Sequence, residues 1–61
     1  MYVYIEQKRK TVLETVTDYF VGFYQPNGEF YVEATYSPGV YGAANAIHAA
    51  AERVHYLNGG N

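Results

Sequence analysis

Hydrophobic and polar residues follow two different spacings along this chain. Between residues 19 and 36, aromatic and β-branched residues are frequent, as in Tyr19-Phe-Val-Gly-Phe-Tyr24. If successive side chains point to opposite faces, apolar residues fall on both faces. A period of two is typical of a β-strand. Residues 43 to 57 are instead rich in alanine and contain neither proline nor glycine, which favours an α-helix. The pattern therefore predicts a sheet followed by one helix.

The segment Gln25-Pro26-Asn27-Gly28 predicts the turn of a β-hairpin. Proline fixes φ at the second position, and glycine accepts the left-handed conformation that closes a bulged loop. This turn pairs Gln25 with Glu29. The pairs that follow on one face of the sheet are Tyr24 with Phe30, Gly22 with Val32, and Phe20 with Ala34.

The N-terminal part gives a weaker pattern. Residues 2 to 6 predict a first strand, and the like charges of Lys8-Arg9-Lys10 indicate a solvated turn. Residues 11 to 17 predict a second extended stretch, with a short helix as the alternative. Because one regular strand would place Glu14 and Asp18 on the face of Phe20, we expect a bulge or bend near residues 17 and 18.

The predicted helix has a stripe of mostly small residues at helical spacing, and Asn58-Gly59 is suited to end it. The stripe consists of Ala43, Ile47, Ala50, Ala51, Val54 and Leu57. We expect it to lie over the sheet face that carries Phe20, Gly22, Tyr24, Phe30 and Val32, because a slim helix fits above a glycine. The prediction is one α+β domain over residues 1–61: an antiparallel sheet of three or four strands with one C-terminal helix on one face.

The other predicted sheet face is also apolar. It carries Tyr19, Val21, Phe23 and Tyr31, and one helix cannot cover both faces. A chain of 61 residues is marginally stable unless a disulfide, a bound metal or a partner chain stabilises it. This chain has no cysteine and so no disulfide. We therefore expect a homodimer that buries these four residues.

The composition argues against some classes of function but identifies none. The net charge of −2 gives neither the positive field of a nucleic-acid-binding protein nor the dense negative field of a DNA mimic. No apolar run is long enough for a membrane span, so a soluble cytoplasmic protein is expected. Eight tyrosines are suited to a surface that is exposed to solvent in the free protein and buried in a complex.

Ionisable residues on the helix suggest binding rather than catalysis. His48, Glu52 and His55 share one helix face, and the last two form a Glu-x-x-His element found in carboxylate-bridged metal sites. Such sites need further carboxylates on facing helices, which only a second copy of this chain could supply, so we expect no metal and no cofactor, with a metal-dependent dimer as the alternative. No nucleophile, base and orienting group converge in the sequence, so we expect no enzyme activity.

Two residues extend this helix face into a candidate partner-binding surface. Tyr41 precedes the helix and Tyr36 lies in the preceding connection, so the predicted surface consists of Tyr36, Tyr41, His48, Glu52 and His55. The alternative is a nucleic-acid-binding module in which Lys8-Arg9-Lys10 contacts phosphates and Tyr2, Tyr4 and Tyr36 stack on bases.

The segments Val21-Gly-Phe-Tyr-Gln-Pro-Asn-Gly28 and Ala51-Glu-Arg-Val-His-Tyr-Leu-Asn-Gly-Gly60 resemble a group of short, uncharacterised proteins of bacteriophages and their bacterial hosts. The similarity covers about the last forty residues, and residues 35–41 differ from the shorter, more acidic connection of that group. The resemblance implies a phage setting and no catalytic residue. By analogy with other small phage proteins, we expect a host protein as partner, with inhibition of a host defence enzyme as the function.

Overall fold

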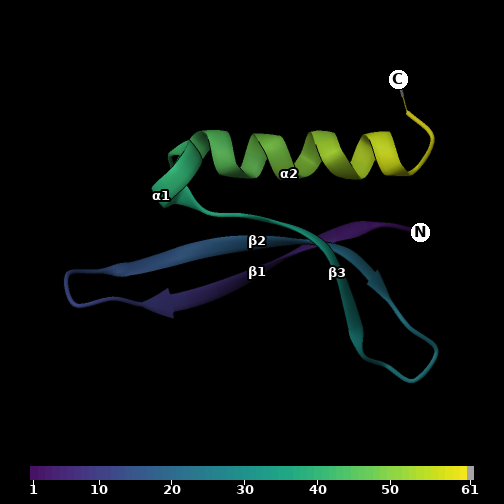
Figure 1. Ribbon diagram of the computed structural model, residues 1–61, viewed down its shortest axis with the longest axis horizontal. Helices are drawn as coiled ribbons and strands as arrows, with labels where there is room; N and C mark the ends of the chain where they lie inside the picture. The colour runs from purple at the N-terminus through teal and green to yellow at the C-terminus, as the bar shows by residue number, and fades with distance from the viewer. Residues whose placement is uncertain (61) are drawn as a thin grey trace.

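The computed structural model describes residues 1–60, apart from the side chain of Val40. An antiparallel sheet of three strands in the order β1-β2-β3 has one long helix along one face (Figure 1). The elements are β1 (Val3–Lys10), β2 (Thr15–Tyr24), β3 (Phe30–Tyr36), a short helix α1 (Pro38–Tyr41) and α2 (Ala43–Leu57). The predicted α+β class, with a C-terminal helix on one sheet face, is confirmed.

The turn between β2 and β3 forms as predicted. The Gln25 amide donates to the Glu29 carbonyl at 2.7 Å, and the Gly28 amide donates to the Gln25 carbonyl at 2.9 Å. Gly28 has φ of 91°, a conformation that costs glycine little because it has no Cβ. The predicted pairs Tyr24 with Phe30 and Gly22 with Val32 are both present.

A bulge in β3 changes the pairing further along the hairpin. The register shifts between Val21 and Gly22, so that Glu33 is an extra residue in β3 and Phe20 pairs with Thr35. The predicted Phe20–Ala34 pair is therefore wrong, as is the bulge predicted near residues 17 and 18, which pair regularly with β1. Bulges bend the strand that carries them. Beyond this point the hairpin turns away from α2 (Figure 1).

The first hairpin is longer than predicted. Lys8, Arg9 and Lys10 belong to β1, and the turn lies at residues 11–14, where the Thr11 hydroxyl donates to the Glu14 carbonyl at 2.8 Å. The solvated turn predicted at the basic residues is wrong because a strand sends successive side chains to opposite faces, which separates the like charges. The tip of this hairpin exposes two apolar side chains, Val12 and Leu13.

Helix α2 covers the sheet face opposite to the one predicted. The apolar residues that are fully enclosed among those described are Val21, Ala46 and Ala50. Val21 lies on the face opposite Phe20, and the covered part of the helix includes Ala46 rather than Ala43, Ile47 and Ala51, which are exposed. The predicted buried stripe is thus correct at Ala50, and Val54 and Leu57 are half-buried.

The missing side chain at Gly22 makes room for the neighbouring strand and not for the helix. A Cβ atom at this position would overlap the carbonyl oxygen of Tyr31 in the neighbouring strand. The glycine therefore permits the close approach of β3 at the bulge. It gives no reason for a helix to lie above it, which removes the argument for placing α2 on the Phe20 face.

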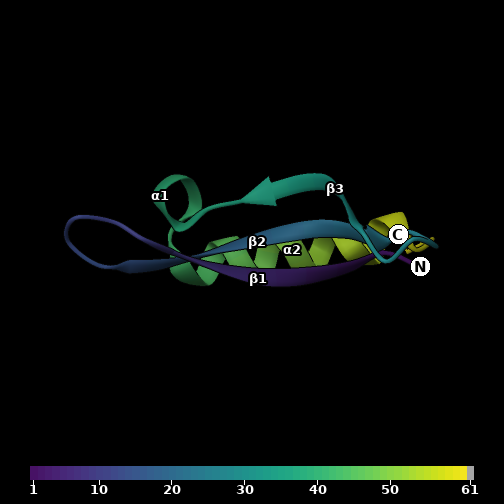
Figure 2. The same ribbon diagram turned by 90° about the horizontal axis from the view of Figure 1, so that it is seen from below.

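Two further contacts hold α2 to the sheet. The Tyr2 amide donates to the Asn58 side-chain oxygen at 2.8 Å, and the Asn58 side-chain amide donates to the Tyr2 carbonyl at 2.9 Å. At the same end, Gly59 has φ of 94°, in agreement with the predicted helix stop. The side of the sheet away from α2 has no element over it among residues 1–60 (Figure 2).

Candidate functional site

Tyr36 and Tyr41 form one part of the predicted partner-binding surface. Tyr36 is the last residue of β3, and Tyr41 ends the short helix α1 that follows. Their ring centroids are 5.6 Å apart, and Tyr41 is 44% exposed. Pro38 at the start of α1 favours the tight turn that brings the two rings together.

The ionisable residues on the outer face of α2 form a second part. His48 Nε2 lies 3.5 Å from Glu52 Oε2, one helical turn away, and both side chains are more than two-thirds exposed. His55 follows in the last turn of the helix, where a positive charge would be favoured by the helix dipole. Among residues 1–60, no group of three histidine, cysteine, aspartate or glutamate side chains is placed to hold a metal ion.

An ion pair between α2 and β3 was not predicted from the sequence. Arg53 donates two hydrogen bonds to the Glu33 carboxylate, at 3.2 and 2.5 Å. These bonds hold the pKa of Glu33 below its ordinary value of 4.5, against the opposing effect of partial burial. The ion pair depends on the bulge, because the bulge places Glu33 as an extra residue on the helix side of β3, within reach of Arg53.

Tyr56 extends the same flank of the molecule. Its ring lies 5.4 Å from the Arg53 guanidinium carbon, within the range of a cation–π contact, and the residue is 63% exposed. Helical spacing gives a signal for Tyr56, because it follows Glu52 by four residues. We define the tyrosine surface as Tyr36, Tyr41, Arg53 and Tyr56, and the helix crest as His48, Glu52 and His55.

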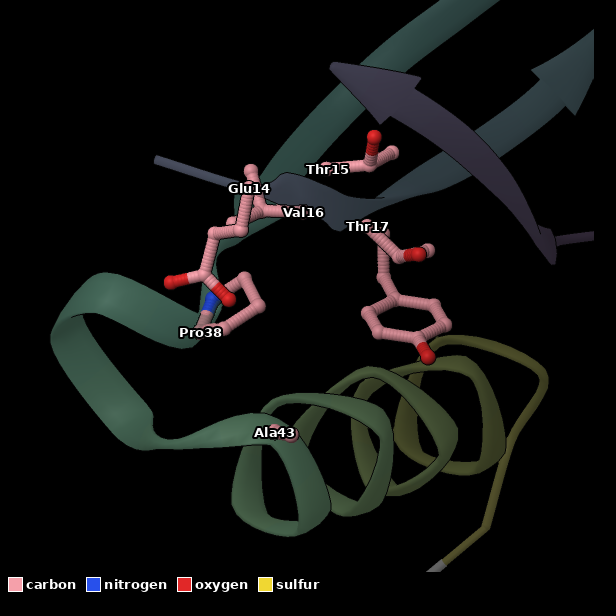
Figure 3. A pocket seen from close by; sticks show the side chains of 7 residues that line it. Glu14, Thr15, Val16, Thr17, Pro38 and Ala43 are labelled. Carbon is pink, nitrogen blue, oxygen red and sulfur yellow. The ribbon is translucent and has the colours of Figure 1, made fainter. Parts of the chain in front are cut away.

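A shallow pocket of about 230 Å³ opens between β2, α1 and the start of α2 (Figure 3). Its lining residues are Glu14, Thr15, Val16, Thr17, Tyr19, Pro38 and Ala43. Glu14 is the one carboxylate among them, and neither a histidine nor a lysine is present to activate a hydroxyl.

The basic run predicted as an alternative phosphate-binding patch is divided by the strand. Arg9 donates to the Asp18 carboxylate at 2.9 and 3.2 Å, whereas Lys8 and Lys10 alternate with it along β1. The Arg9 hydrogen bonds hold the pKa of Asp18 below its ordinary value of 3.8, against partial burial, and Ser37 acts in the same direction as Arg9. The three charges thus form no continuous patch.

The four residues predicted to form a dimer interface lie on the covered face. Val21 is fully enclosed within the single chain, so it has no surface to offer a second copy. Phe23 contacts Tyr2 and Tyr31, at centroid distances of 5.4 and 5.1 Å. Tyr19 lies against Tyr4 and lines the pocket beside α2. With α2 in its observed place, Val21 cannot contact a second copy, whereas Tyr31 keeps 48% of its surface exposed.

Comparisons of the chain with protein-family models, curated proteins and solved structures find no match. Across residues 1–60, no helix is both long enough and apolar enough to cross a membrane.

Proposed function

We propose that this chain is a small, non-catalytic protein of phage origin that acts in the host cytoplasm by binding a host protein. The target is a host defence enzyme, which the protein inhibits, and the active form is a homodimer. The resemblance of residues 21–28 and 51–60 to short phage proteins supports the phage setting. The pocket, which has one carboxylate and no partner base, supports a function without catalysis.

The tyrosine surface is the observation that carries this proposal. Tyrosine and arginine are among the residue types enriched at the energetic centres of protein interfaces. Tyrosine buries a large area at small entropic cost. Arg53 is held in place by Glu33 and faces the ring of Tyr56. A surface whose side chains are already ordered loses less conformational entropy on binding.

The helix crest adds polar specificity beside this surface. His48 and Glu52 contact each other and are otherwise open to solvent, so both can form hydrogen bonds with a partner. Such a polar rim around aromatic anchors is the usual composition of a protein interface. A dimer would present the surface twice, which raises the apparent affinity for a multivalent target without new contacts.

Affinity capture from a host lysate tests the proposal directly. The wild-type chain should retain a specific protein identified by mass spectrometry, and a Tyr41→Ala, His48→Ala double variant should lose it. The matched control is a Lys8→Ala, Lys10→Ala double variant, whose two changes lie on exposed positions of β1 away from the nominated surface. This control should retain the protein as well as wild type does.

Three outcomes would contradict the proposal in different ways. Capture of no specific protein would remove the protein-binding function. Equal capture by wild type and by the Tyr41→Ala, His48→Ala variant would show that the binding site lies elsewhere. Loss of capture only in the lysine control, together with salt-dependent binding of a labelled oligonucleotide, would favour the nucleic-acid alternative.

A further inference from the structure

The sheet face away from α2 is apolar and uncovered. The register places Val3, Ile5 and Phe20 on this face together with their neighbours in the second hairpin. We define the open face as Val3, Ile5, Phe20, Tyr24, Phe30 and Val32. None of these six side chains is buried, and Val32 is 45% exposed. A soluble protein rarely leaves so continuous an apolar face in water.

The single chain buries too little surface for its size. Its solvent-accessible area is 4455 Å², whereas a compact monomer of 6.9 kDa exposes about 4000 Å². Its Cα radius of gyration is 12.3 Å, against about 10.5 Å for a compact domain of this length. The enclosed apolar residues, Val21, Ala46 and Ala50, are all small. A chain with such a core needs a disulfide, a bound metal or a partner chain to be stable.

From these observations we infer that a second copy of this chain packs its open face against the first, forming a two-layer sheet sandwich with α2 on each outer side. The inference gives a surface to the homodimer of the proposed function, and it does not depend on the identity of the target. A second copy is the favoured occupant because it is present whenever the chain is folded. Both chains then gain the core that each one lacks.

Charge on the open face is compatible with self-packing. Its one charged contact is the Arg9–Asp18 ion pair near one end, which is neutral as a pair. Two copies therefore meet without like charges facing each other, as an interface between identical surfaces requires.

The sheet edges are less suited to self-association. The free edge of β1 carries Lys8 and Lys10, and β3 is interrupted by the bulge at Glu33. Lysines and bulges on edge strands are two common devices against pairing with another chain. The open face thus remains as the surface available for a symmetric contact.

The bend of the second hairpin sets the orientation of the two copies. The β2–β3 hairpin turns toward the open side, at the end of the molecule opposite the tip of the β1–β2 hairpin (Figure 1). If the two copies ran in the same direction, their bent hairpins would collide. An antiparallel arrangement avoids the collision and places the tip of one copy, with Val12 and Leu13, beside Tyr24 and Phe30 of the other.

This arrangement covers the most exposed apolar residues of the chain. Val12 is 101% exposed, Leu13 is 92% exposed and Tyr24 is 62% exposed. A face of about 33 Å along β2 and about 14 Å across three strands would have a footprint of about 460 Å², and this is an upper limit because β2 pairs with both neighbours only from Tyr19 to Gly22. Stable interfaces bury about 800 Å² of accessible surface per partner, so we expect a dimer of modest affinity.

Mass measurement over a dilution series tests the dimer, and two neighbouring residues of β3 test its face. At high micromolar concentration, light scattering should give twice the chain mass of 6.9 kDa. Val32→Glu should give the single mass, because Val32 is on the open face. Tyr31→Glu is the matched control, since Tyr31 has nearly the same exposure, 48% against 45%, but points to the helix side. It should remain dimeric.

Disulfide trapping tests the orientation in a folded chain, because the protein contains no cysteine. A Leu13→Cys, Tyr24→Cys double variant should form a covalent dimer under mild oxidation. Leu13 lies two residues before the start of β2 and Tyr24 ends this strand of ten residues, so the two positions are too far apart to bond within one chain. Leu13→Cys alone should stay uncrosslinked at the same concentration.

Each opposite result would overturn a stated part of the inference. A single mass at all concentrations would remove the dimer, while target capture could still succeed. A single mass for Tyr31→Glu with a double mass for Val32→Glu would move the interface to the helix side. Crosslinking of Leu13→Cys alone would show that the two tips meet, which contradicts the antiparallel arrangement.

Discussion

The two faces of the sheet differ in what they carry and in what covers them. The helix side encloses Val21 beneath Ala46 and Ala50, whereas on the opposite side Phe20 and Phe30 are half-buried, Val32 is exposed and no element of residues 1–60 lies over them. Large aromatic side chains thus lie on both faces, since Tyr19, Phe23 and Tyr31 are on the helix side. Close packing, and not hydrophobic volume, determines where α2 lies, because small residues allow the helix axis to approach the sheet.

The bulge in β3 affects both faces of the sheet. On the helix side it directs Glu33 toward Arg53, and on the open side it bends the second hairpin over the uncovered face. Gly22 permits this geometry, since any side chain there would overlap the Tyr31 carbonyl. Changes at these positions should therefore affect the two faces by different amounts.

Gly22→Val should produce the largest loss of stability. Its side chain would push β3 away at the bulge, and overpacking of this kind costs about 1 to 3 kcal/mol, with the upper end expected against a backbone atom. Urea unfolding monitored by tyrosine fluorescence measures the loss. Gly39→Ala is the control, because nothing lies near the position of its Cβ atom. An unchanged midpoint for Gly22→Val would show that the bulge relaxes at little cost.

Ala50→Leu should have the next largest effect and should separate the covered from the exposed side of α2. Ala50 is fully enclosed, so a larger side chain would force the helix away from Val21, at a cost of about 1 to 3 kcal/mol. Ala51→Leu places the same side chain at the next, exposed residue, where about 0.5 kcal/mol or less is expected. Equal destabilisation by the two changes would contradict the observed helix orientation.

Glu33→Gln should give a smaller effect that depends on pH. The folded state lowers the pKa of Glu33, so the ion pair stabilises the fold above pH 4.5 and this contribution is lost as the pH falls through the lowered value. Unfolding curves measured from neutral pH downward should show less loss of stability in acid for Glu33→Gln than for wild type. Glu29→Gln, in the exposed turn, is the control and should keep the wild-type acid dependence.

Local signals predicted much of the fold. The turn at residues 25–28 and the stop at Gly59 depend on the conformational freedom of glycine, which is a property of each residue and its neighbours. The face covered by α2 could not be obtained in this way. Both faces of the β2–β3 hairpin are apolar, so a two-residue period gives the register and leaves the covered face undetermined.

The candidate site was predicted in part for a similar reason. The helix crest follows from helical spacing alone, and the contact between His48 and Glu52 agrees with it. Arg53 and Tyr56 are three residues apart on α2, so their contact also follows from helical spacing, whereas Glu33 reaches Arg53 because the bulge changes the register of β3. Such an extra residue has no distinctive mark in the sequence of the strand, so the ion pair that holds Arg53 in the tyrosine surface could not be predicted from the sequence.

The paired hydrogen bonds between Tyr2 and Asn58 have a consequence for the order of folding. They join residues 56 positions apart, and closing a loop of that length costs about 3.6 kcal/mol of chain entropy beyond a constant. Each hairpin closes a far shorter loop, so both can form before this contact. Docking of the helix end should therefore be a late event, and the Tyr2 amide should exchange its hydrogen with solvent sooner than the amides in the centre of β2.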